Sequence, residues 1–163
     1  MQWLYGDDAI DDKCRLDSGF WFGLGVFETI RVHAAPLFWE PHIVRLNAGL
    51  NALSIRPPVD AAELLAEIRS KGVRNCVLKI AVTADHVVFQ TRTIPEEAKD
   101  YLLLPVEDTR SRNQLIIGNK TLNCLENVLA RRQASENGCD DVLYIGKDNT
   151  LSETCRANLF WLR

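Results

Sequence analysis

Residues 75–93, NCVLKIAVTADHVVFQTRT, place the strongest constraint on what this chain can fold into. Two arms rich in β-branched residues alternate on either side of Ala84, Asp85 and His86. Alternation of this kind is typical of strands, and a short polar turn between two such arms predicts an antiparallel hairpin. Because an isolated hairpin is only marginally stable, other strands and helices have to cover it. We therefore expect an α+β fold.

The residues before the hairpin supply those elements. Segment 19–33, GFWFGLGVFETIRVH, is aromatic and β-branched and predicts a strand, with the short segment 36–40, PLFWE, paired to it. A helix follows, because apolar residues recur at helical spacing at Ile43, Leu46, Leu50 and Leu53, up to the RPP sequence at 56–58. A second helix starts at Asp60, with a capping box to Glu63, and stops near Gly72.

The polar segment 107–114, EDTRSRNQ, is the best candidate for a linker, because it contains no apolar residue. We predict an N-terminal α+β domain over 1–106, which ends on a strand in YLLLPV, a linker over 107–114, and an incomplete C-terminal domain over 115–163.

The C-terminal domain is predicted to begin with a short strand in LIIGNK, at 115–120. A helix then starts with a capping box between Asn123 and Glu126 and ends at Asn137-Gly138. Its expected buried residues are Leu125, Val128 and Leu129. Segment 141–163 predicts a strand, a tight turn, a second strand and a third strand that has no successor.

Composition excludes several classes of function. The net charge is -3 and the Lys and Arg residues are scattered, which argues against a nucleic-acid or anionic-membrane partner. No apolar run approaches the length of a membrane span, and the N-terminus lacks the pattern of a signal peptide. The five cysteines show no metal-ligand spacing, so reduced thiols and a cytoplasmic location are expected.

Three residues could carry chemistry. Lys120 follows a short apolar segment, where partial desolvation would make its amine nucleophilic. Glu153 lies among small residues, where a carboxylate could hold a protonated ring nitrogen, and Arg45 is of the type preferred for clamping phosphate. Taken singly, each is more often an ordinary surface residue. Together they are the groups that pyridoxal phosphate requires.

The chain resembles the class IV aminotransferases, which are the fold-type IV pyridoxal-phosphate enzymes. The resemblance lies in four segments that occur in order: FGLGVFETIRV, PLFWEPHIVRLNAGLNAL, NKTLNCLENVLARRQASENGCDDVLYI and ETCRANLF. It implies a two-domain fold, pyridoxal 5'-phosphate as the cofactor, a small-molecule amino substrate and a homodimer. It further implies that Lys120 carries the Schiff base, Glu153 holds the pyridine nitrogen, Arg45 binds the phosphate and Asn158 belongs to the signature.

Within the family the chain is most similar to the bacterial aminodeoxychorismate lyases. The D-amino-acid branch has an Arg-x-His sequence where Ala84, Asp85 and His86 stand here, and a Tyr where Phe27 stands. These differences favour a lyase that releases pyruvate to give 4-aminobenzoate for folate synthesis. A branched-chain or D-amino-acid aminotransferase, or a non-catalytic fragment of such an enzyme, stays open as an alternative.

Relatives in this family continue beyond the point that matches Arg163. We therefore expect the 163-residue chain to be a fragment that ends on an open strand and holds the cofactor weakly.

Overall fold

The computed structural model describes residues 2–5, 16–55, 58–96, 100–110 and 113–162. The chain divides into two compact units. Unit 1 contains Met1–Pro95 and Arg112–Asn123, and unit 2 contains Glu96–Ser111 and Cys124–Arg163. Each unit has its own sheet. Among the described residues no helix is long and apolar enough to cross a membrane, and no cluster of potential metal ligands occurs.

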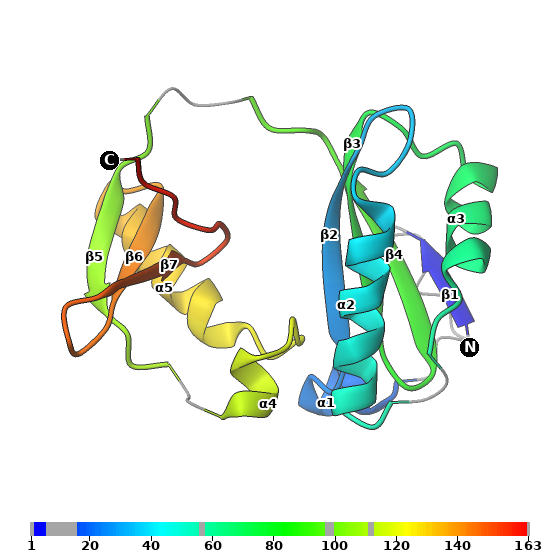
Figure 1. Cartoon of the computed structure of the whole chain (residues 1–163), viewed down its shortest axis with the longest axis horizontal. Coiled ribbons are helices and arrows are strands. Elements are labelled where there is room, and N and C mark those ends of the chain that lie inside the picture. Colours follow the sequence, from blue (N-terminus) through cyan, green and yellow to red (C-terminus); the bar gives the residue numbers. More distant parts are fainter. Residues whose placement is uncertain (1, 6–15, 56–57, 97–99, 111–112, 163) are drawn as a thin grey trace. The chain divides into compact units, whose positions relative to one another are not determined.

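Unit 1 is built on a four-stranded sheet with the order β1-β4-β3-β2 (Figure 1). Strands β3 (Cys76–Val82) and β4 (His86–Arg92) form the predicted antiparallel hairpin, with Val82 opposite Val87. Strand β2 (Val26–Val32) pairs antiparallel with β3, and β1 (Gln2–Tyr5) pairs parallel with β4. The hairpin prediction is confirmed.

Two helices cover this sheet and form a continuous core with it. Helix α2 (Trp39–Ala52) lies along the sheet in Figure 1, and it buries the predicted stripe at Ile43, Leu46 and Leu50. Helix α3 (Ala61–Ser70) begins as predicted, because Asp60 accepts a hydrogen bond from the backbone of Glu63. The core of unit 1 joins residues from both helices and from β2, β3 and β4.

The segment predicted as one strand over 19–33 is wrong in its first part. Residues Ser18–Phe22 form the short helix α1, and β2 starts only at Val26. Asp17 caps the helix by accepting from the backbone of Gly19 and Phe20, and Gly23 closes it at a φ of 65°. Local capping therefore outweighs the strand preference of the aromatic residues. PLFWE likewise adds only one bridge, between Pro36 and Val32, before α2 begins.

The predicted strand in LIIGNK is also wrong. Residues Gln114–Ile117 form the short helix α4, which starts where the side chain of Asn113 accepts from the backbone of Leu115. Asn123 does not cap the next helix, because its amide donates to the carbonyl of Gly23 at 3.0 Å. The N-cap position falls instead on Cys124, without a side-chain cap.

Unit 2 is a three-stranded sheet, β5-β6-β7, with the single helix α5 against it. Strand β5 (Leu103–Glu107) pairs parallel with β6 (Asp141–Ile145), and β7 (Leu151–Thr154) pairs antiparallel with β6. Helix α5 (Leu125–Glu136) ends at Asn137 as predicted. The buried apolar core is small, and it consists of Ala134, Val142 and Tyr144.

The predicted buried face of α5 is wrong. Leu125, Val128 and Leu129 are 66%, 51% and 50% exposed. Ala130 and Ala134, one turn apart, make the apolar contact of the helix with the sheet.

The predicted third strand near the C-terminus does not form in the described part of the chain. After Thr154 the backbone turns, and the Thr154 hydroxyl accepts from the backbone of Ala157. Phe160, Trp161 and Leu162 are exposed, and no described strand pairs with them. A strand needs such a neighbour to satisfy its backbone groups.

The two compact units differ from the predicted boundaries at 106 and 115. Strand β5 falls in unit 2, because it pairs with β6, whereas residues 113–123 fall in unit 1. The described cysteines, Cys76, Cys124, Cys139 and Cys155, are free thiols, and Cys14 lies outside the described residues.

Candidate functional site

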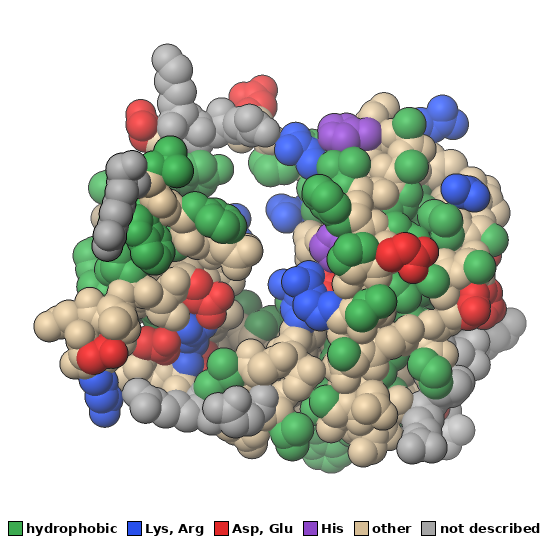
Figure 2. Space-filling model, in the orientation of Figure 1, with side chains coloured by type: hydrophobic (Ala, Val, Ile, Leu, Met, Phe, Trp, Pro, Cys, Tyr) green, Lys and Arg blue, Asp and Glu red, His purple; other side chains and the backbone are tan. Residues whose placement is uncertain are grey.

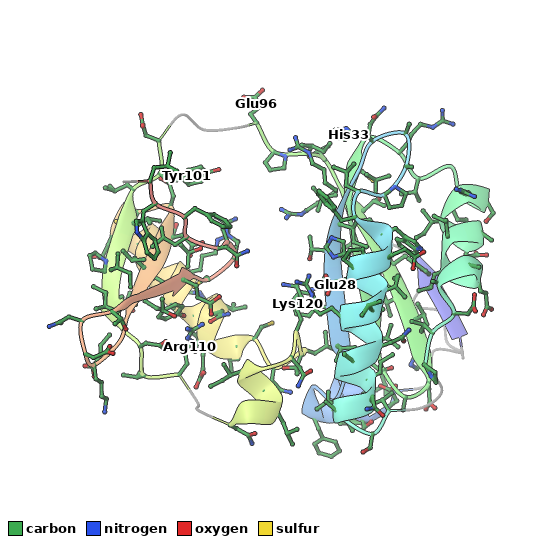
Figure 3. All side chains as sticks on the ribbon, in the orientation of Figure 1. Glu28, His33, Glu96, Tyr101, Arg110 and Lys120 are labelled. Atoms are coloured by element: carbon green, nitrogen blue, oxygen red, sulfur yellow. The ribbon has the colours of Figure 1, made fainter. Side chains whose placement is uncertain are left out.

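Lys120 lies in unit 1, where its backbone is attached to the start of β2. Its carbonyl accepts from the backbone of Phe27 at 2.8 Å, and Leu122 donates to Gly25 at 2.9 Å. Thr121, between them, forms an isolated bridge with Val26. Lys120 follows a turn and not a strand, but these backbone bonds hold it beside β2 in the sheet of unit 1 (Figure 3).

The side chain of Lys120 is exposed, and its amine lies 4.8 Å from the centre of the Phe27 ring. A second amine approaches the same ring, because Nζ of Lys79 on β3 lies 4.6 Å from its centre. In Figure 2, basic side chains gather on this face of unit 1. Two cations on one aromatic ring make a region that attracts anions.

Arg45 on α2 forms a fork-shaped ion pair with Glu28 on β2. Its Nε and Nη2 donate to the two carboxylate oxygens at 2.5 and 2.7 Å, and His42 Nδ1 lies 2.8 Å from Oε2. Glu28 is fully buried, whereas the Arg45 side chain is 58% exposed. Among the described residues Nη1 of Arg45 has no hydrogen-bond partner, so one edge of the guanidinium is open to a ligand.

This arrangement fixes the charge on both partners. Burial alone would raise the pKa of Glu28, but the hydrogen bonds from Arg45 and His42 outweigh it and lower that pKa below its usual value. The hydrogen bonds that Arg45 donates to Glu28 in turn raise the pKa of Arg45. A fixed guanidinium with a free edge is suited to bind a phosphate group.

Sequence reasoning missed Glu28 and His42 as partners of Arg45. A signal for His42 existed, because residues three apart on a helix lie on the same face. Glu28 had a weaker signal, since it is a carboxylate at an inward position of an alternating strand. Its pairing with α2 depends on tertiary structure.

Glu153 lies in unit 2, on β7. One of its oxygens, Oε1, accepts from Nη1 of Arg110 at 2.9 Å. Arg110 is itself paired with Asp108, and its guanidinium lies 3.8 Å from the centre of the Tyr144 ring. The Glu153 side chain is 47% exposed, and within the described ranges its second oxygen accepts no hydrogen bond. Sequence reasoning missed this partner, because Arg110 lay within the predicted linker.

Asn158 follows the turn after β7 and is exposed. Its side chain makes no hydrogen bond to any residue that the structure describes. The structure thus places Lys120 and Arg45 in unit 1, where each contacts β2, and it places Glu153 and Asn158 in unit 2.

Residues at the tip of the β3–β4 hairpin bond to Asp17, the N-cap of α1. Asp17 accepts from the Thr83 hydroxyl, from the backbone of Asp85 at 3.1 Å, and lies 3.3 Å from Nδ1 of His86. His86 is buried. These residues join the hairpin to the cap of α1.

The open groups fit pyridoxal phosphate in their chemistry. An exposed amine matches an aldehyde, a guanidinium with a free edge matches a phosphate, and a half-exposed carboxylate with a free oxygen matches a protonated ring nitrogen. Each of the three keeps an amine, a guanidinium edge or a carboxylate oxygen that is not bonded to another described residue. The roles of Lys120, Arg45, Glu153 and Asn158 stay predictions at this point.

Comparison with known proteins matches residues 25–163 to the family model of the class IV amino-transferases. The aminodeoxychorismate lyase of Vibrio harveyi is 27% identical over 168 residues, which cover 90% of this chain and 62% of that protein. The chain thus spans about three fifths of the length of the curated relatives that it matches.

Two solved structures share the fold. The 4-amino-4-deoxychorismate lyase of Pseudomonas aeruginosa is 28% identical with a TM-score of 0.70, over 92% of this chain and 63% of that one. A fold IV-transaminase of Curtobacterium pusillum is 22% identical with a TM-score of 0.67, over 90% of this chain and 59% of that one. The predicted fold class is confirmed.

Proposed function

This chain belongs to the class IV aminotransferase family, and from that premise we propose that its protein is a pyridoxal-phosphate-dependent aminodeoxychorismate lyase. The observation that carries the proposal is the attachment of Lys120 to β2, with its amine exposed over Phe27. The lyases among the relatives support the choice of reaction.

Each open group has a separate task. Arg45 binds the phosphate through its free edge, while Glu28 keeps the guanidinium in place. Lys120 is the attachment point for the cofactor and, once released, the base that moves a proton at the substrate carbon bearing nitrogen. Glu153 holds the proton on the ring nitrogen. When bound, pyridoxal phosphate supplies an electron sink for the electrons left at that carbon.

In the proposed reaction Lys120 removes the proton from the carbon that carries the 4-amino group of 4-amino-4-deoxychorismate. The C–O bond to the enolpyruvyl group breaks, and the group leaves as an enolate that takes up a proton to become pyruvate. Formation of the aromatic ring of 4-aminobenzoate drives the step. The substrate carries carboxylates, and Lys79 offers a second cation beside the reacting amine. Replacing Lys79 by Met should therefore raise KM more than it lowers kcat.

The attachment point can be tested by borohydride reduction and peptide mapping of the protein expressed from its natural reading frame. The label should fall on Lys120 and disappear in Lys120→Ala. Lys79 is a matched control, because its amine lies at a similar distance from Phe27. A label on Lys79 would contradict the assignment.

The reaction can be tested with two substrates. Aminodeoxychorismate should give 4-aminobenzoate and pyruvate in equal amounts. Leucine or D-alanine with 2-oxoglutarate should give little glutamate. The opposite outcome would make the protein an aminotransferase of the same family. In the same proposal the protein is a homodimer, which light scattering of the purified holoenzyme would test.

A further inference from the structure

Arg110 in unit 2 has every side of its guanidinium occupied by a neighbour. Nε and Nη2 donate to the two oxygens of Asp108 at 2.9 and 2.8 Å, and Nη1 donates to Oε1 of Glu153 at 2.9 Å. The plane rests on the ring of Tyr144. The Arg110 side chain is only 19% exposed. Figure 3 labels this residue within unit 2.

The groups that hold Arg110 are themselves fixed by the sheet. Asp108 comes directly after β5, and its backbone donates to Ile145 of β6 at 2.8 Å. Tyr144 is buried in β6, and its hydroxyl donates to Asn127 of α5 at 3.1 Å. Strand and helix contacts therefore set the position of the guanidinium before any ligand arrives.

Glu153 gains its orientation from this guanidinium. It lies on the four-residue edge strand β7, and its half-exposed side chain would otherwise sample several rotamers. The bond to Arg110 holds one oxygen, Oε1, and leaves Oε2 without a partner among the described residues. A carboxylate that is oriented in advance loses less entropy when it binds.

We propose that Arg110 is a positioning residue for the cofactor: it holds Oε1 of Glu153 so that Oε2 is presented to the ring nitrogen. This proposal rests on the proposed function, because it takes Glu153 as the partner of the ring. Asp108 and Tyr144 act through Arg110, and Arg110 acts through Glu153.

A matched arginine–carboxylate pair in the same unit serves as the control. Nε of Arg156 lies 3.4 Å from Oδ2 of Asp141, and no bond joins Arg156 to Glu153 among the contacts of the described residues. Replacing Arg156 removes an arginine–carboxylate pair from unit 2, and it should leave the orientation of Glu153 unchanged.

The test is a double-mutant cycle on the protein expressed from its natural reading frame, with the Kd for pyridoxal phosphate as the readout. Arg110→Met keeps the apolar stem against Tyr144, and it should raise Kd roughly tenfold, in the range of coupled neighbouring residues. Glu153→Gln should also raise Kd. Because Arg110 acts through Glu153, the double variant should bind no more weakly than Glu153→Gln alone. Arg156→Met should bind like the wild type.

The absorption spectrum of the bound cofactor provides a second readout. Arg110→Met should shift the balance of its bands in the same direction as Glu153→Gln, whereas Arg156→Met should not. Melts without cofactor identify any variant that has lost its fold, and Arg110→Gln then takes the place of Arg110→Met.

Two results would overturn the proposal while the proposed function stands: additive effects of the two variants on Kd, or a folded Arg110 variant that binds and absorbs like the wild type. If Glu153→Gln alone has no effect on Kd or on the spectrum, the assigned role of Glu153 fails, and the positioning role fails with it.

Discussion

The two units hold their charged candidate residues in different ways. In unit 1, Glu28 is fully buried beneath α2, and a continuous core from two helices and three strands surrounds it. In unit 2 the buried apolar core is limited to Ala134, Val142 and Tyr144, and the ion pairs of Arg110 lie partly in solvent. Apolar packing fixes one site, whereas a hydrogen-bonded network fixes the other.

This difference has a physical consequence. A buried ion pair depends strongly on both partners, because losing one leaves a charge without water or counter-charge. A partly exposed network shares its charges with solvent, so each bond contributes less. The candidate residues of unit 1 should therefore respond to mutation more steeply than those of unit 2.

The largest expected effect comes from the apolar cores. Leu78→Ala in β3 of unit 1 should cost about 2–5 kcal/mol of unfolding free energy, because it leaves a cavity among fully buried neighbours. Val142→Ala in unit 2 should cost about 1–3 kcal/mol, because fewer carbon atoms are removed from a smaller core. Hydrogen exchange of amides in each unit under urea would measure both. A greater loss from Val142→Ala would contradict the expected difference between the apolar cores of the two units.

Glu28→Gln should have the next largest effect, about 1–3 kcal/mol, because Arg45 keeps partial access to water after losing its partner. The pKa of Glu28 is lowered, so its contribution to stability is full above the ordinary value of 4.5 and falls as the pH drops through the folded value. Denaturant melts of both proteins from pH 7 to pH 3 would test this.

The two curves should lie apart by a constant amount above about pH 5 and converge in acid. Glu63→Gln is the control, since Glu63 is exposed on α3. Curves that stay parallel down to pH 3 would show that the pKa of Glu28 is the same in the folded and the unfolded protein, and would contradict the prediction.

Asp108→Asn in unit 2 should cost less, about 0.5–1.5 kcal/mol, because the Asp108–Arg110 pair is partly exposed. The loss should appear in the exchange rates of the Val142 and Tyr144 amides and leave those of β3 unchanged. A loss as large as that of Glu28→Gln would mean that the network of unit 2 is shielded from solvent as well as the Glu28–Arg45 pair of unit 1.

Leu129→Gln on α5 should have the smallest effect, within about 0.5 kcal/mol, because this side chain is half exposed in the chain. Ala134→Gln is its buried counterpart and should be strongly destabilising, because Ala134 is fully buried and a longer polar side chain would overpack the core of unit 2. Equal effects from the two changes would show that Leu129 is buried in solution, as the sequence pattern of α5 predicts.

Sequence patterns predicted the elements that depend on long periodic stretches. The alternation in 75–93 and the stripe at Ile43, Leu46 and Leu50 extend over several residues, so one contrary residue does not hide them. The short helices at 18–22 and 114–117 were missed, because one side chain decides each of them. Asp17 and Asn113 accept from backbone groups that a strand would have used otherwise.

The candidate site divides in the same way. Lys120, Arg45, Glu153 and Asn158 could be named from the sequence because they belong to motifs shared with a family. Their partners could not be named, since Glu28 and Arg110 meet them through contacts between distant strands and helices. The predicted capping box at Asn123 was also wrong. The side-chain amide of Asn123 donates instead to the carbonyl of Gly23, a hundred positions earlier in the chain.

The crossing of the chain between units sets an order of events during synthesis. Strand β1 finds its partner only when β4 has been made, and the backbone of Phe27 in β2 can donate to the carbonyl of Lys120 only later still. In between, the ribosome makes residues 96–111, which belong to the other unit. We therefore expect Lys120 to join a sheet that has already formed. A nascent chain arrested once residue 95 has left the ribosome should already protect the hairpin amides from exchange, while the Phe27 amide stays open until Lys120 emerges.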